Sequence, residues 1–184
     1  MQYRNTQTGY GWISISIHWI TAITVIGMFV LGLWMVDLTY YDEWYRTAPL
    51  IHKGIGVMLL LLTLFRLIWK RMNPLPAEVA EHKPIERRLA KIVHSMLYVL
   101  LFALMITGYL ISTADGRALE VFNWFSIPAT ISGIEHQEDI AGEVHEILAF
   151  SLIAIVVLHA VGAIKHHVID KDNTLKRMLG LRVL

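Results

Sequence analysis

The sequence predicts an all-α integral membrane protein, a four-helix transmembrane bundle with both termini on the cytoplasmic side. Hydrophobic residues make up 55% of the 184 residues and the mean hydropathy is +0.52. This is more apolar weight than the single core of a soluble domain needs. Four apolar segments are long enough to cross a bilayer, and the basic residues gather on one side of them. The alternative is a soluble all-α protein with buried helices.

Four transmembrane helices are expected, at residues 12–36, 50–69, 92–112 and 140–168. At about 1.5 Å of rise per residue, each reaches roughly the 30 Å of a hydrocarbon core. Peptide groups cannot stay unpaired in lipid, so segments of this composition must be helical. The first segment is too long for the apolar part of a signal peptide, so we expect it to be retained. Residues 1–184 are predicted to form one domain.

The charges predict the orientation of the helices. Most basic residues lie before the first helix, between the second and third, or after the fourth: Arg4, Arg66, Lys70, Arg71, Lys83, Arg87, Arg88, Lys91, Lys165, Lys171, Lys176, Arg177 and Arg182. The opposite side has three bases and ten acids: Arg46, Lys53, Arg117, Asp37, Asp42, Glu43, Asp115, Glu120, Glu135, Glu138, Asp139, Glu143 and Glu146. By the positive-inside rule both termini face the cytoplasm. The basic runs therefore require no nucleic acid partner.

Histidine is the residue type that points to chemistry. The chain has nine histidines and no cysteine, which excludes disulfides, cysteine-bound zinc, iron–sulfur clusters and thioether-attached haem. His18 and His159 lie about six residues from the inner ends of their predicted helices. His52 and His145 open their helices on the outer side. The sequence therefore predicts two histidine pairs at matched depths, one in each leaflet.

The spacing within the fourth helix supports this pairing. His145 and His159 are fourteen residues apart, so their directions differ by only about 40° while their heights differ by about 21 Å. One face of one helix thus offers two imidazoles, one near each membrane surface. Ionisable residues inside membranes are rare and usually functional. The alternatives for each histidine taken alone are a helix–helix hydrogen bond or a pore-lining group.

Isolated histidine pairs favour haem over other metal groups. A porphyrin iron needs two axial ligands from the protein, whereas zinc needs three or four converging ligands, and no acid lies deep in any predicted helix. A large planar macrocycle also favours small neighbours, although these are common in membrane helices. Small residues at helical spacing from the four histidines are Ala22, Gly32, Gly56, Gly142, Ala149, Gly162 and Ala163. The metal-ligand prediction is therefore His18 with His159 and His52 with His145.

Two further polar residues lie within the predicted spans. Arg66 follows His52 by fourteen residues, so we expect it on the same face at the inner depth, where haem propionates would balance its charge. Snorkelling to the interface is the alternative. His94 lies closer to the inner end of its helix and is interpreted as a propionate or quinone contact, or as an interfacial packing residue. His166 and His167 are expected to face the headgroups.

The long outer connection, residues 113–139, is rich in apolar side chains. They include two phenylalanines, a tryptophan and two isoleucines: Phe122, Trp124, Phe125, Ile127 and Ile131. Such a stretch is expected to anchor at the membrane interface. Covering the outer haem is the alternative.

Several local motifs resemble those of a known family. They are Ile17-His18-Trp19, Ile51-His52 with Gly56, the region around His145, His159-Ala160, and a tail that contains Lys165-His166-His167 and the run from Lys171 to Met178. Over nearly its whole length the chain resembles the bacterial cytochrome b561 family, the short four-helix type with two haems. The resemblance implies haem b at each of the two histidine pairs. It also implies a redox protein of the bacterial cell inner membrane that exchanges electrons with the quinone pool.

Transmembrane electron transfer through two bis-histidine b haems is therefore the predicted function. Bis-histidine ligation leaves iron without an open position, which favours outer-sphere electron transfer over oxygen binding. The expected partners are lipid, ubiquinone and a periplasmic donor or acceptor, and a quinone-linked oxidoreductase activity stays open. One similar protein type oxidises superoxide and reduces ubiquinone. The alternatives are a haem-bearing anchor subunit of a larger redox complex and a haem or metal transporter.

Overall fold

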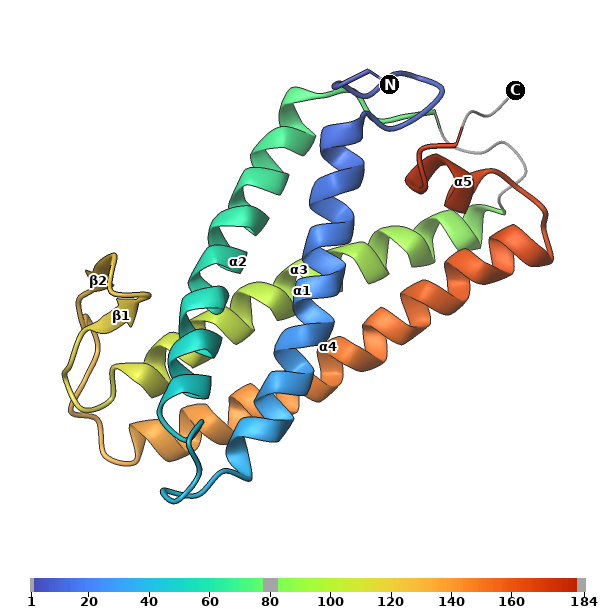
Figure 1. Ribbon diagram of the computed structural model, residues 1–184. Helices are drawn as coiled ribbons and strands as arrows, with labels where there is room; N and C mark the ends of the chain where they lie inside the picture. Colours follow the sequence, from blue (N-terminus) through green and yellow to red (C-terminus); the bar gives the residue numbers. More distant parts are fainter. Residues whose placement is uncertain (1, 78–82, 182–184) are drawn as a thin grey trace. The chain divides into compact units, whose positions relative to one another are not determined.

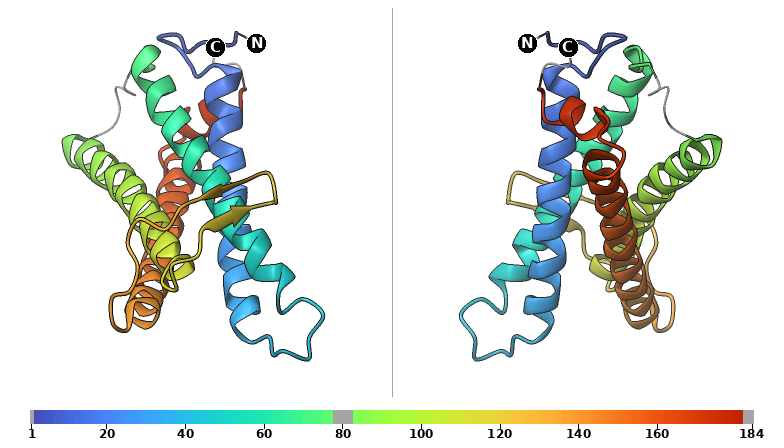
Figure 2. Two further views of the ribbon diagram at one scale, coloured as in Figure 1. Left: turned by 90° about the vertical axis from the view of Figure 1, so that its left-hand side faces the viewer. Right: turned by 90° about the vertical axis from the view of Figure 1, so that its right-hand side faces the viewer.

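The computed structural model describes residues 2–77 and 83–181 and is mostly helical (Figures 1 and 2). Arg182, one of the basic residues used to predict the orientation, lies outside the described residues. The elements in chain order are α1 (Trp12–Val36), α2 (Thr47–Met72), α3 (Pro84–Ser112), β1 (Leu119–Val121), β2 (Phe125–Ile127), α4 (Gln137–Val168) and α5 (Thr174–Met178).

Helices α1 to α4 are each long and apolar enough to cross a membrane. Their large hydrophobic side chains are mostly exposed, whereas few apolar residues are buried. A protein in water would pay heavily for this exposure, but lipid tails cover such surfaces without cost. The predicted fold class, an all-α protein with four membrane helices, is confirmed apart from a short β-hairpin. The cytoplasmic position of the termini stays a prediction.

The helix ends extend beyond the apolar segments that predicted them. Helix α2 starts at Thr47 and ends at Met72, α4 starts at Gln137, and α3 starts at Pro84. The residues added to α3 are charged and amphipathic, so hydropathy alone does not include them. Proline suits the first position of a helix, and the Glu86 carboxylate accepts a hydrogen bond from the Lys83 backbone N–H at 3.0 Å. This is half of a capping box, and it fixes the start of α3.

The chain packs into two compact units. Unit 1 contains Met1–Ile23, Leu62–Leu97 and Ala154–Leu184, and unit 2 contains Thr24–Leu61 and Tyr98–Ile153. Each of the helices α1 to α4 contributes one stretch to each unit. Each unit holds one of the two predicted histidine pairs complete. The prediction of a single domain over residues 1–184 stays a prediction.

In unit 2, the connection between α3 and α4 forms an antiparallel β-hairpin in which Leu119 pairs with Ile127 (Figure 1). At its tip Phe122 and Asn123 have positive φ angles of 49° and 58°, as tight hairpin turns require. The Phe122 ring lies against Gly54 of α2, where a Cβ atom would stand 2.6 Å from the ring. Glycine at this position therefore lets the hairpin lie against α2, two residues from His52.

The aromatic residues of this connection divide between two environments. Phe122 packs one side of its ring against α2 and is 37% exposed, whereas Trp124 and Phe125 are 73% and 46% exposed. Exposed aromatic side chains fit the expected anchoring at the membrane interface. Anchoring itself stays a prediction.

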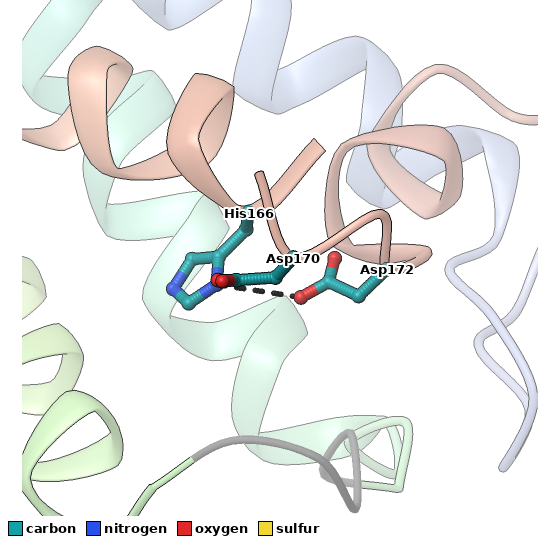
Figure 3. Close-up of side chains that lie close together, drawn as sticks. All are labelled: His166, Asp170 and Asp172. Carbon is teal, nitrogen blue, oxygen red and sulfur yellow. Dashed lines mark hydrogen bonds and ion pairs between the residues drawn. The ribbon is translucent and has the colours of Figure 1, made fainter. Parts of the chain in front are cut away.

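In unit 1, ion pairs connect the end of α4 to its neighbours. The Lys165 ammonium donates to the carboxylates of Glu86 and Asp170, at 2.6 Å each. His166 Nδ1 lies 2.7 Å from Asp170 and 3.3 Å from Asp172 (Figure 3). His166 thus pairs with acids of its own chain, and the prediction that it faces headgroups missed this contact. The hydrogen bond from Lys165 holds the pKa of the Asp170 carboxyl below its usual value.

Figure 3 shows the His166 ring and the two carboxylates pointing toward one another. Their ligand atoms lie within 4.8 Å, close enough to share a metal ion. The ammonium of Lys165 already balances Asp170, and the other carboxylate, Asp172, accepts a hydrogen bond from the Thr174 N–H at 2.8 Å. We therefore interpret the cluster as an ion-pair network that orders the chain between α4 and α5.

Helix α5 is held against α1. The Trp19 indole N–H donates to the Met178 carbonyl at 2.8 Å, and the Arg177 guanidinium donates to the Ala77 carbonyl at 2.8 Å. Trp19 follows His18 directly, and the two rings make an edge contact with centroids 5.3 Å apart. The C-terminal motif therefore packs beside the first predicted ligand of unit 1.

Candidate functional site

Unit 2 brings His52 of α2 and His145 of α4 together. Their ring centroids are 6.4 Å apart and the ring planes are inclined at 67°. Both residues are half-buried. The two histidines are 93 positions apart in the chain, so only the folding of the helices brings the two rings close together, with the edge of one toward the other.

Thr107 of α3 hydrogen-bonds to His145. The Thr107 hydroxyl oxygen lies 3.0 Å from the carbonyl oxygens of Ala103 and Leu104 and 2.9 Å from His145 Nδ1. When the hydroxyl donates its one proton to a carbonyl of its own helix, a common arrangement for threonine in helices, it accepts from His145 Nδ1–H and the lone pair of Nε2 is available. Histidines that bind metals are oriented in this way by a partner of the other ring nitrogen.

Two glycines stand beside the rings of this pair. A Cβ atom at Gly32 would lie 3.5 Å from His52 Cε1, and one at Gly108 would lie 3.3 Å from His145 Cε1. The first of these would be an ordinary van der Waals contact, whereas the second would require the His145 ring to shift by a few tenths of an ångström. His52 Nδ1 is buried and has no hydrogen-bond partner within the described part of the chain. Unit 2 therefore has closely approached imidazoles and a polar atom that protein groups leave unsatisfied.

Unit 1 brings together three histidines. His18 of α1 and His159 of α4 have ring centroids 6.2 Å apart with planes inclined at 60°. His94 of α3 lies closer to His159, at 5.1 Å between centroids. His18 and His159 are half-buried, whereas His94 is exposed. The sequence placed His94 at a shallower depth, and it did not predict this contact.

Arg66 of α2 lies against His18, with its Nη2 atom 2.9 Å from His18 Nδ1. A guanidinium only donates hydrogen bonds, so His18 Nδ1 accepts and the ring proton is on Nε2. A metal bound through Nε2 would leave the proton on Nδ1, and a metal bound through Nδ1 would occupy the position that Arg66 uses. In either case a ligating His18 releases Arg66 to another acceptor.

The ring spacings test whether a metal fits between the imidazoles. A metal binds an imidazole nitrogen at about 2.0 Å and the ring centroid lies about 1 Å further back, so two rings opposed across one metal have centroids about 6 Å apart. The distances of 6.2 Å for His18–His159 and 6.4 Å for His52–His145 meet this requirement. The 5.1 Å between His94 and His159 is too short for it.

The two imidazole nitrogens of each pair suit a metal whose remaining ligands come from a prosthetic group. Each suitable pair offers two nitrogen atoms, and the hydrogen-bond partners of their rings are a hydroxyl in unit 2 and a guanidinium in unit 1. Neither partner is a ligand that would complete a zinc site. Haem iron, with four porphyrin nitrogens, needs only two axial imidazoles. The residues present therefore fit haem at both pairs.

Comparison with known proteins identifies the class. The family described as prokaryotic cytochrome b561 matches residues 9–181, and the chain belongs to this family. It is 50% identical to cytochrome b561 homolog 2 of Escherichia coli (strain K12), over 98% of this chain and 96% of that protein. It is 29% identical to the probable superoxide oxidase CybB of Yersinia pestis, over 92% of this chain and 95% of that protein. It is 28% identical to cytochrome b561 homolog 1 of Escherichia coli (strain K12), over 91% and 95%.

Family membership and the four membrane helices agree on the general function. The protein is a multi-pass bacterial membrane protein and a cytochrome with b-type haem that transfers electrons. The resemblance predicted from local motifs is thus confirmed.

Proposed function

We propose that this protein carries electrons across the bacterial inner membrane through two b haems, one held by His18 and His159 and the other by His52 and His145. The observation that carries the proposal is the spacing of 6.2 Å and 6.4 Å between the ring centroids of these two pairs. Each haem would supply one-electron chemistry at its iron. With both axial positions taken by imidazole, the protein keeps other ligands off the metal and favours outer-sphere transfer.

In the same proposal Arg66 binds a propionate of the unit 1 haem. Ligation of His18 removes the guanidinium from Nδ1, and an anionic partner stabilises the charge of a half-buried guanidinium in a membrane helix. A propionate would offer two oxygens to the planar fork of the arginine. His94, beside His159 but too near to oppose it, would contact the same haem or a bound quinone.

Ubiquinone at one end and a periplasmic partner at the other are the proposed redox partners. The similarity to a probable superoxide oxidase makes superoxide the first donor to test. The acids that the sequence assigns to the outer connections are all exposed in unit 2. Negative charge repels an anion and attracts a basic protein. We therefore favour a neutral or cationic donor over superoxide.

Haem content tests the proposal directly. The purified, folded protein should hold two low-spin b haems per chain in a pyridine haemochrome assay combined with a protein determination. Reduction by quinol, superoxide and ascorbate in stopped flow would then identify the partners. One haem or fewer in fully folded protein would contradict the two-site proposal.

A further inference from the structure

Permanent positive charge surrounds the histidines of unit 1. Arg66 donates to His18 and its charge also acts on His94 and His159. Lys70, one turn further along α2, adds its charge at His94. The two cations share one face of α2: Arg66 lies at the site that His18 and His159 form, and Lys70 lies near His94, the third histidine of the unit.

The histidines of unit 2 have neutral neighbours. The polar groups that contact His145 are the hydroxyl of Thr107 and the backbone carbonyl of Leu104, and the close approaches are those of two glycines, Gly32 and Gly108. Lys53 follows His52 directly, so the two side chains leave α2 about 100° apart. The unit 2 site therefore combines the same ligand type with a less positive setting.

We propose that Arg66 gives the His18–His159 site the higher reduction potential of the two, so that an electron shared by the two sites resides mainly there. This inference rests on the proposed function, since it requires both haems. Reduction adds one electron and hence one negative charge to the site, and a neighbouring cation stabilises the reduced form. A unit charge about 10 Å away, at an effective dielectric constant of about 20, shifts such an equilibrium by roughly tenfold.

Because Arg66 hydrogen-bonds to His18, Arg66 is the main source of the higher reduction potential. Ligation of His18 removes the guanidinium from Nδ1 but leaves it anchored on α2 next to the ring. If it then pairs with a propionate, its removal would expose that carboxylate and lower the potential further. Both arrangements give the same sign, so the direction of the shift does not depend on which acceptor Arg66 takes.

Redox titration of single-site proteins tests the inference. His52→Ala leaves only the unit 1 site and His18→Ala leaves only the unit 2 site, so each midpoint potential is measured alone. We expect the unit 1 site to bind an electron at least about tenfold more tightly, which is about 59 mV for one electron. Adding Arg66→Gln to His52→Ala should reduce that preference at least about fivefold, whereas Arg66→Lys should retain most of it.

Arg117→Gln is the matched control, because it removes one positive charge from an exposed arginine of unit 2 that pairs with Asp115. It should leave the unit 1 potential unchanged. If Arg66→Gln does not retain haem, Lys70→Gln gives the test, with a smaller shift in the same direction. An unchanged or raised potential in Arg66→Gln, in protein with both ligands intact at that site, would overturn the inference and leave the two-haem proposal standing. Failure of the wild type to bind two haems would instead overturn the proposed function.

Discussion

The two units place the same pair of proposed ligands, two histidines, in different surroundings. Each takes one histidine from α4 and a partner from α1 or α2 at almost the same ring spacing. In unit 1 the pair has a guanidinium and a third histidine beside it. In unit 2 it has a threonine hydroxyl and two glycines. Matching ligands with different neighbours is how proteins give chemically identical metal groups different properties.

Replacing one proposed ligand should eliminate the haem of its own unit and leave the haem of the other unit in place. His145→Ala should eliminate the haem of unit 2, and His159→Ala the haem of unit 1, because an iron that loses one of two axial imidazoles is held much less firmly. Each variant should keep half of the haem absorbance and show a single redox step. His94→Ala is the control and should keep both haems. Loss of a haem in His94→Ala, with retention in His18→Ala, would show that the ligands of unit 1 are assigned wrongly.

Removing the side chain that orients His145 should weaken haem binding in unit 2 alone. Thr107→Val keeps the shape of the side chain but removes the hydroxyl that hydrogen-bonds to His145 Nδ1. Partners of this kind are worth about 10-fold to 100-fold in metal affinity. We expect faster transfer of the unit 2 haem to an acceptor such as apomyoglobin, with unit 1 unchanged.

Thr107→Ser is the matched control, because it restores the hydroxyl and should return the slow haem transfer of the wild type. If Thr107→Val and the wild type lost haem at the same rate, the hydrogen bond would have no part in holding the ring.

The negative charge of the exposed acids on unit 2 should lower the rate of reaction with an anionic donor. The exposed acids of this unit repel superoxide, so its reaction should be slow and should become several-fold faster when salt screens the repulsion. Pulse radiolysis at several ionic strengths measures this directly. A rate near the diffusion limit that falls with added salt would mean that the bases of unit 2, Arg46, Lys53 and Arg117, outweigh the acids.

The smallest effect is expected in the network that orders the tail of unit 1. The pKa of Asp170 is lowered by the hydrogen bond from Lys165, so its contribution to stability is present above the ordinary carboxyl value of 3.8 and is lost as the pH falls through the folded value. Asp170→Asn should therefore lower the melting temperature slightly at neutral pH. The difference from the wild type should disappear in acid, and a difference that persists there would exclude the ion pair as its cause.

Contiguous stretches of the sequence were enough to predict the helices and the residues they carry. Hydropathy located the four spans because lipid imposes one composition on an uninterrupted segment of fixed length. The ends were predicted less well, since the first residues of α3 are charged and their helix depends on Pro84 and the cap at Glu86. The hairpin was not predicted either, because its position depends on the contact between the Phe122 ring and Gly54, which are far apart in the sequence.

Histidine spacing predicted which rings should meet, because depth in a membrane follows directly from position along a helix. Spacing could not predict what stands beside the rings. The bond of Thr107 to His145, the approach of Gly108 and the contact of His94 with His159 depend on how each helix is rotated about its axis and how closely it packs. Contacts between residues of separate helices form only in the tertiary structure, and no local sequence pattern predicts them. The sequence by itself therefore determined the four membrane helices and the histidines they carry, and only the tertiary structure decided the different surroundings of the two pairs.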